Sequence, residues 1–140
     1  MLLFDGSDAP GAIRGPKAVA VHTVLLAEDE ELLREVAAIT LRRARYVVIE
    51  AGDTDSAFAA VNHSGQKVDL LITDVMLPGI GGLRLFEELL RSNPALKVVF
   101  ISGYSVEVVF KDAPLPGGAL FLQKPYETSS LLASVVQLLH

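Results

Sequence analysis

Carboxylate, hydroxyl and ammonium side chains follow apolar runs at several points in the chain. These groups are the acidic triplet Glu28-Asp29-Glu30, then Asp74, Ser102 and Lys124. Carboxylates that come together without a counter-ion repel one another, so such a cluster needs either protons or a cation. Mg²⁺ suits this role, because it prefers oxygen ligands and is usually held by one or two carboxylates together with phosphate oxygens. The residue types therefore predict a magnesium site that works on phosphate.

Asp74 could do more than hold a metal. A carboxylate can be the nucleophile that forms an aspartyl phosphate, provided that positive charges neutralise the incoming phosphoryl oxygens. Mg²⁺ and Lys124 would supply those charges. We expect Asp29 and Asp74 to bind the metal directly, and Glu28 to bind it directly or through a water molecule.

The apolar runs that precede these residues alternate with helical patterns. Strands are predicted at residues 21–27, 46–50, 68–73, 97–102 and 119–122. Helices are predicted at residues 30–44, 54–62, 83–91 and 128–139, with Thr128 as the N-cap of the last, and a short helix lies within 105–112. Strands that alternate with helices form a parallel sheet covered on both faces, a doubly wound α/β sandwich. Its ligand site lies beyond the carboxyl ends of the strands, which is where the polar residues fall.

The composition is that of one globular domain. The 140 residues carry a net charge of −5 and no cysteine, which argues against non-specific nucleic-acid binding, disulfides and Cys-ligated zinc. Residues 1–20 contain several Gly and Pro residues and predict a tail or linker, so the domain is expected at residues 21–140. The apolar stretch 18–27 is too short and too interrupted to cross a bilayer, so we expect no membrane insertion and a cytoplasmic protein.

Four segments, taken in order, resemble the receiver domain of two-component response regulators. They are LLAEDE (25–30), LLITDVMLPGIGG (70–82), VVFISGYS (98–105) and LFLQKPY (120–126). The resemblance covers roughly residues 22 to 139. It implies a flavodoxin-like (βα)5 fold with strand order 2-1-3-4-5, and a function as a phosphoacceptor rather than as an enzyme. It fits both a single-domain regulator and the C-terminal receiver of a hybrid kinase.

The resemblance also implies the phosphorylation chemistry. Asp74 would be phosphorylated by a histidine kinase or a histidine phosphotransfer protein. Mg²⁺, or Mn²⁺ in its place, would be held by Glu28, Asp29, Asp74 and the backbone carbonyl of Met76. Glu28 stands where the family more often has Asp. The longer arm, by one methylene, would favour a contact through water or alter the affinity for the metal.

Four further residues match positions that the family uses in catalysis or switching. Lys124 would pair with the phosphoryl group, and Ser102 would be the switch hydroxyl that moves to bind it. Phe121 would be the aromatic residue that turns inward when the hydroxyl moves. Pro125 would follow a cis peptide bond that aims the lysine at the site.

The sequence departs from the family pattern near the site. Gly81 stands where many relatives have Asp. Tyr104 is large enough to overhang the site and, together with Met76, would hinder the water that removes the phosphoryl group. We therefore expect a long-lived phosphorylated state.

The output would pass through protein contacts. By resemblance, the face of the fourth helix, fifth strand and fifth helix would change on phosphorylation, and it would include Val106, Phe110 and Tyr126. Whether the protein also forms a homodimer stays open. The sequence does not distinguish a stand-alone regulator from part of a hybrid kinase.

Other functions compete less well with the phosphorylated receiver. A receiver-like binding module that works without phosphorylation is the main alternative, and it would be favoured if an acid, the hydroxyl or the lysine were missing. All are present. A flavin binder is disfavoured because the loop after the first strand is acidic. An aspartyl-phosphate hydrolase is disfavoured because that strand ends in Glu28-Asp29-Glu30 rather than in an Asp-x-Asp motif.

Overall fold

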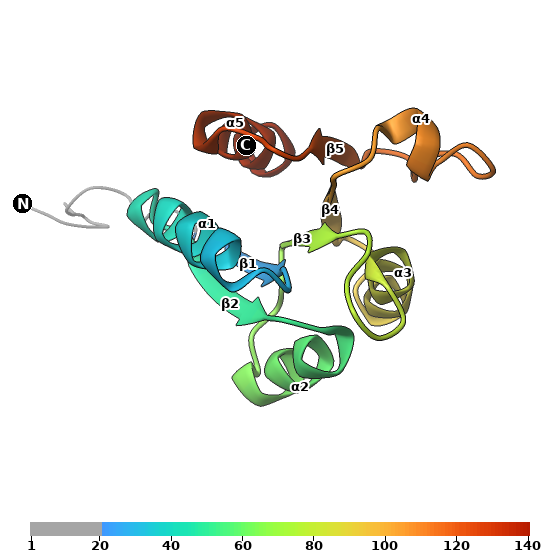
Figure 1. The fold of residues 1–140 in the computed structure, drawn as a ribbon. Helices are drawn as coiled ribbons and strands as arrows, with labels where there is room; N and C mark the ends of the chain where they lie inside the picture. Colours follow the sequence, from blue (N-terminus) through green and yellow to red (C-terminus); the bar gives the residue numbers. More distant parts are fainter. Residues whose placement is uncertain (1–20) are drawn as a thin grey trace, which may run out of the picture.

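A computed structural model describes residues 21–140, which form a parallel five-stranded sheet with helices on both faces (Figure 1). The strands are β1 (Thr23–Ala27), β2 (Val47–Ala51), β3 (Leu70–Asp74), β4 (Lys97–Ser102) and β5 (Leu120–Gln123). They lie in the order β2-β1-β3-β4-β5, which confirms the predicted doubly wound, flavodoxin-like architecture. The strand order reverses beside β1, because the chain goes first to β2 and then to β3 on the other side of β1. The carboxyl ends of β1 and β3 therefore meet at this switch point.

Every residue of β1 and β3 is buried, because helices cover both faces of the sheet at its centre. Successive side chains of β1 point to opposite faces, so Val24 and Leu26 join one core cluster while Leu25 and Ala27 join the other. The unbroken apolar runs in the sequence are thus the sign of two cores that share one sheet.

The helices divide between the two faces (Figure 1). They are α1 (Glu31–Arg43), α2 (Thr54–Ser64), α3 (Gly82–Ser92), α4 (Val106–Val109) and α5 (Thr128–Leu139). Residues of α1 and α5 build the first core cluster, and residues of α2 and α3 build the second. The sheet and these four long helices hold the loops at its carboxyl edge in place.

One local prediction needs correction. The prediction that Thr128 is the N-cap of the last helix is wrong, because Glu127 has the extended backbone of an N-cap (φ −88°, ψ 149°) and Thr128 is already helical. No side-chain hydrogen bond caps this helix. The predicted short helix within 105–112 is confirmed, and it is four residues long, since the β-branched Val residues in this stretch have low helix propensity.

The expected tail or linker at residues 1–20 lies outside the described residues. Within residues 21–140, no helix has the length and apolar character needed to cross a membrane.

Candidate functional site

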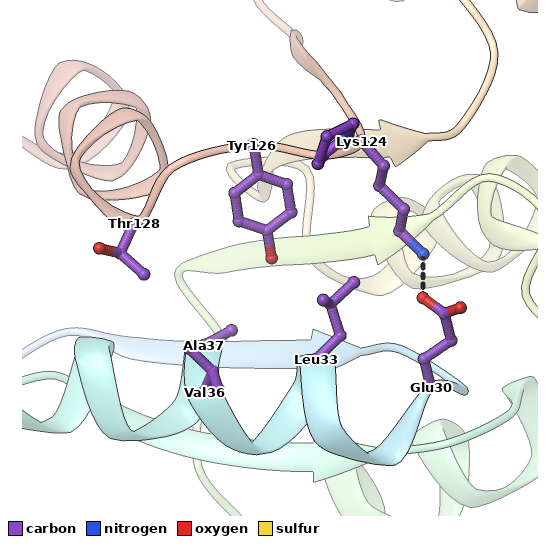
Figure 2. A pocket seen from close by; sticks show the side chains of 8 residues that line it. Glu30, Leu33, Val36, Ala37, Lys124, Tyr126 and Thr128 are labelled. Carbon is purple, nitrogen blue, oxygen red and sulfur yellow. Dashed lines mark hydrogen bonds and ion pairs between the residues drawn. The ribbon is translucent and has the colours of Figure 1, made fainter.

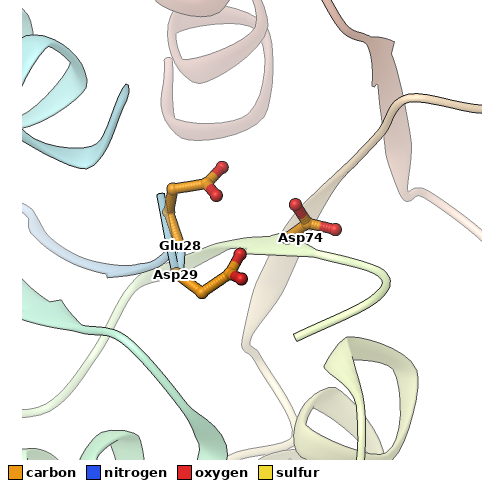
Figure 3. Close-up of side chains that lie close together, drawn as sticks. All are labelled: Glu28, Asp29 and Asp74. Atoms are coloured by element: carbon orange, nitrogen blue, oxygen red, sulfur yellow. The ribbon is translucent and has the colours of Figure 1, made fainter. Parts of the chain in front are cut away.

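Three carboxylates come together at the carboxyl edge of the sheet (Figure 3). Parallel pairing aligns Ala27 of β1 with Thr73 of β3, so the residues that follow them, Glu28 and Asp74, lie side by side. One oxygen each from Glu28, Asp29 and Asp74 lies within 4.8 Å of the other two. Glu28 is 2% exposed and Asp74 is 6% exposed, whereas Asp29 is exposed to solvent. The cluster therefore has a buried base and one open side.

Lys124 supplies the positive charge of this cluster. Its Nζ atom lies 2.6 Å from Asp74 Oδ2 and also donates to Glu28 Oε2 and to Glu30 Oε1, both at 3.2 Å. Burial acts to lower the pKa of Lys124, but the hydrogen bonds to Asp74 and Glu28 and the charge of Glu28 outweigh it and raise the pKa above its usual value. Lys124 is therefore a permanent cation next to Asp74.

The peptide bond between Lys124 and Pro125 is cis, as the resemblance to receiver domains implied. The backbone N–H of Lys124 donates to the carbonyl of Ser102 at 2.7 Å, which joins this loop to the end of β4. The lysine thus reaches the acidic cluster from the far side of the sheet edge.

Glu28 has an oxygen that the protein does not satisfy. Its Oε2 atom accepts from the Glu30 backbone N–H at 3.0 Å and from Lys124. Its Oε1 atom lies 3.1 Å from Lys124 Nζ, which is an ion-pair distance, but it is buried and accepts no hydrogen bond. Burial, which outweighs the hydrogen bonds from Glu30 and Lys124, raises the pKa of the Glu28 carboxyl. A buried carboxylate oxygen without a hydrogen-bond donor can bind a cation instead, and three carboxylate oxygens at this spacing fit Mg²⁺.

The loop after β3 is held against Asp74. Asp74 Oδ1 accepts from the Met76 backbone N–H at 2.9 Å, and Thr73 Oγ1 donates to the Asp74 carbonyl at 3.0 Å. A Cβ atom at Gly82 would collide with that same carbonyl oxygen, so only glycine fits where α3 begins. These contacts fix the backbone on both sides of the carboxylate.

The predicted switch residues Ser102 and Phe121 lie on the neighbouring strands β4 and β5. Ser102 is fully buried, and its Oγ atom accepts from the Tyr104 backbone N–H at 3.0 Å. Phe121 is half-buried in the second core and packs edge-on against Phe110, with ring centroids 6.2 Å apart. Tyr104 is 60% exposed.

The comparisons with known proteins settle the family. The model of the response regulator receiver domain matches residues 24–136. The chain belongs to this family. Both the resemblance stated from the four sequence segments and the function as a two-component receiver are therefore confirmed.

Two relatives illustrate the range of proteins that contain this domain. A sensor kinase, CckA of Brucella abortus, is 32% identical over 117 residues, which are 84% of this chain and 12% of the kinase. The response regulator receiver protein CpdR, from the same organism, is 28% identical over 116 residues, which are 83% of this chain and 95% of CpdR. The crystal structure of the receiver domain of the hybrid histidine kinase CckA superposes with a TM-score of 0.71 at 36% identity. That match covers 84% of this chain and 99% of that domain.

A receiver domain implies a histidine kinase as its partner. The acidic cluster of this receiver is typical of the Mg²⁺ site of the family.

An apolar pocket of about 420 Å³ adjoins the acidic cluster between α1 and the loop that leads to α5 (Figure 2). Leu33, Val36 and Ala37 of α1 form one wall, and Tyr126 faces them. The ion pair of Lys124 with Glu30 forms one end of the pocket. Burial raises the pKa of the Tyr126 hydroxyl, and the nearby Glu28 charge raises it further. The receiver thus carries an apolar surface within electrostatic reach of its charged site.

Three residues make contacts at the site that the sequence did not reveal. Glu30 precedes α1 and its side chain is 62% exposed, yet it forms an ion pair with Lys124. Thr54, the first residue of α2, is buried, donates its backbone N–H to the Pro78 carbonyl and accepts the Ile80 N–H on its Oγ1. It thereby holds the loop after β3.

Arg34, on α1, donates to the Glu28 carbonyl at 2.7 Å. A signal for it was present in the sequence, since a cation near a helix N-terminus is opposed by the helix dipole and needs a partner.

Proposed function

We propose that Asp74 is the phosphoacceptor of this receiver. The observation that carries the proposal is the contact of Lys124 Nζ with Asp74 Oδ2 at 2.6 Å inside a cluster of three carboxylates. Asp74 sits at the switch point of the sheet, where the ligand sites of doubly wound folds lie. A nucleophilic carboxylate needs positive charge nearby to receive a phosphoryl group, and Lys124 offers it.

In this mechanism a carboxylate oxygen of Asp74 attacks the phosphorus of a phosphohistidine on the partner kinase or phosphotransfer protein. The new oxygen–phosphorus bond forms as the phosphorus–nitrogen bond breaks, and the imidazole leaves with the electron pair. Lys124 turns from the carboxylate to the phosphoryl oxygens. A bound Mg²⁺ would neutralise the charge on those oxygens, and the residues that would hold it are Glu28, Asp29, Asp74 and the carbonyl of Met76. Mn²⁺, which also accepts oxygen ligands, would serve as well.

The proposed switch follows from the buried hydroxyl of Ser102. It would leave the Tyr104 N–H and donate to the phosphoryl group, and Phe121 would then turn into the space behind it. The consequence would reach the face formed by α4, β5 and α5, where Val106, Phe110 and Tyr126 would meet a downstream protein or a second copy of the receiver. Tyr104 and Met76 are proposed to hinder the hydrolytic water and to lengthen the life of the phosphorylated state.

We propose residues 21–140 as the receiver unit, acting in the cytoplasm without nucleic-acid contact or membrane insertion. The lengths of the two relatives fit either a stand-alone regulator such as CpdR or a receiver that is a small part of a sensor kinase. Expression of residues 21–140 alone tests the boundary: this fragment should take up phosphate as fast as the full chain.

The deciding experiment is intact-mass measurement after incubation with Mg²⁺ and acetyl phosphate. The wild type should gain the mass of one phosphoryl group only when Mg²⁺ is present, and Asp74→Asn should gain none. Asp112→Asn, a change at an exposed carboxylate, is the matched control and should behave as the wild type. If the wild type gains no mass and also ignores beryllofluoride, the receiver works as a binding module without phosphorylation.

A further inference from the structure

Arg34 links three segments that meet behind the acidic cluster. Its Nη1 atom donates to the backbone carbonyl of Glu28 at 2.7 Å, and its Nε atom lies 3.4 Å from Glu50 Oε1. The side chain is 22% exposed, so most of it is enclosed. Arg34 belongs to α1, Glu28 to the loop after β1, and Glu50 to β2. One guanidinium therefore joins a helix, the acidic loop and the neighbouring strand.

The helix dipole opposes a cation at the position of Arg34. It is the fourth residue of α1, close to the positive end of the helix dipole. Gly52, which follows β2, lies beside the guanidinium, and a Cβ atom there would lie 3.3 Å from Nη1.

The carbonyl that Arg34 binds belongs to the peptide group between Glu28 and Asp29. The orientation of this peptide sets the backbone angles ψ of Glu28 and φ of Asp29, and so the directions in which both carboxylates leave the chain. The other end of Glu28 is already fixed, because its backbone N–H donates to the Ala51 carbonyl at 2.9 Å. With both anchors in place, the two acidic side chains share one rigid base.

We propose that Arg34 is a positioning residue for the metal-binding pair Glu28 and Asp29. It touches neither the metal nor the phosphoryl group. It holds the peptide between the two acids. This inference rests on the proposed function, which assigns Mg²⁺ to these carboxylates.

A purely structural role would make Arg34 only one partner in a surface ion-pair network. Arg42 separates the two roles, because it lies on the same helix and binds the same carboxylate, with Nη1 3.0 Å from Glu50 Oε2. Its Nη2 atom donates to the Val48 carbonyl and not to the acidic loop. Arg42→Gln therefore removes an equivalent ion pair without releasing the Glu28 carbonyl.

The test is a calorimetric titration of the phosphate-free protein with Mg²⁺, for the wild type, Arg34→Gln, Arg34→Lys and Arg42→Gln. Partners that orient metal ligands typically change metal affinity by about tenfold or more when removed, so Arg34→Gln should weaken Mg²⁺ binding by about tenfold. Arg42→Gln should change it by about twofold or less. Arg34→Lys should fall between them, because an ammonium can reach the carbonyl or Glu50 but lacks the fork that binds both.

The rate of labelling by acetyl phosphate is a second measurement. It distinguishes a positioning role of Arg34 from a general distortion of the fold. At limiting Mg²⁺ the Arg34→Gln receiver should label slowly, and at saturating Mg²⁺ its rate should return close to that of the wild type. A rate that stays low at all Mg²⁺ concentrations would overturn the positioning role in favour of a general structural one.

Two further outcomes keep the inference separate from the proposed function. Wild-type protein that binds Mg²⁺, together with Arg34→Gln that binds it equally well, overturns the role of Arg34 and leaves the function intact. Wild-type protein that binds no Mg²⁺ overturns the proposed metal site itself, and the role of Arg34 with it.

Discussion

Replacing Glu28 by glutamine should stabilise the metal-free receiver at neutral pH while weakening its response to Mg²⁺. Glu28 is 2% exposed, and burial raises the pKa of its carboxyl, which means that the folded state disfavours the charged form. Glutamine keeps the size of the side chain and removes the charge. Breaking a buried ion pair usually leaves an unpaired charge that is costly, but Lys124 keeps Asp74 at 2.6 Å. The relief of burial should therefore dominate.

The expected gain is about 1 kcal/mol in the free energy of unfolding, typical of a stabilising change at a functional site. For a domain of this size that corresponds to a rise in melting temperature of roughly 4 °C. Glu30→Gln is the matched control, because Glu30 also pairs with Lys124 Nζ at 3.2 Å but is 62% exposed. Its effect should stay within about 0.5 kcal/mol.

The pH dependence of stability is a second test of whether Glu28→Gln is more stable than the wild type. The pKa of Glu28 in the folded state is raised above 4.5. Its contribution to the stability of the wild type is therefore fully present below pH 4.5 and is lost as the pH rises through the raised pKa. Glutamine does not titrate. The advantage of Glu28→Gln should thus be complete at neutral pH and close as pH falls toward 4.5.

Mg²⁺ should reduce or reverse the difference in the free energy of unfolding between Glu28→Gln and the wild type. At a concentration ten times its dissociation constant, a ligand stabilises the folded state by about 1.4 kcal/mol. If the loss of the Glu28 carboxylate weakens binding by about tenfold, the same Mg²⁺ concentration stabilises the variant by only about 0.4 kcal/mol.

Chemical denaturation with and without Mg²⁺, at several pH values, measures all of these quantities. A variant that is less stable than the wild type at neutral pH by more than about 1 kcal/mol, with no closing of the gap at low pH, would refute the reasoning. It would mean that the pairing of Glu28 with Lys124 outweighs the burial of its charge.

Two further substitutions test the phosphorylated state. Tyr104, whose ring is 60% exposed, is replaced in Tyr104→Ala, which should shorten the life of the phosphorylated protein by about threefold to tenfold. This is a change of about 0.7 to 1.4 kcal/mol in the barrier to hydrolysis, measured by loss of the added mass with time. An unchanged lifetime contradicts the shielding role. Ser102→Ala should still accept phosphate on Asp74, but the NMR chemical-shift change of the Phe121 amide that accompanies phosphorylation should disappear. A full shift change at Phe121 in that variant would remove the hydroxyl from the switch.

The sequence by itself determined the layers of the fold and the edge that carries the site. Unbroken apolar runs of strand length, separated by helical patterns, leave few arrangements other than a covered parallel sheet. Because all strands of such a sheet point the same way, residues at or just after the carboxyl ends of β1, β3 and β5 must lie at one edge. The sequence therefore predicts that Glu28, Asp74 and Lys124 lie close together.

Contacts whose partners depend on how helices and loops dock were decided only by the tertiary structure. Glu30 and Lys124 are separated by 94 residues, and nothing in either local sequence indicates their pairing. The contacts of His140, at the opposite edge of the sheet, could not be predicted from the sequence either. Its Nε2 atom forms a 3.0 Å hydrogen bond with the Tyr46 hydroxyl, and its ring centroid lies 5.0 Å from that of His22.

The role of Arg34 shows the physical reason most clearly. Its place near the start of a helix can be read from the sequence, but its choice of the Glu28 carbonyl requires α1 to pack at one angle against β1 and β2, next to a residue without a side chain at position 52. Periodicity and strand-end positions are properties of the chain alone. The direction of a long side chain is a property of the packed whole, because it is chosen by the space and the unpaired polar groups that its neighbours leave.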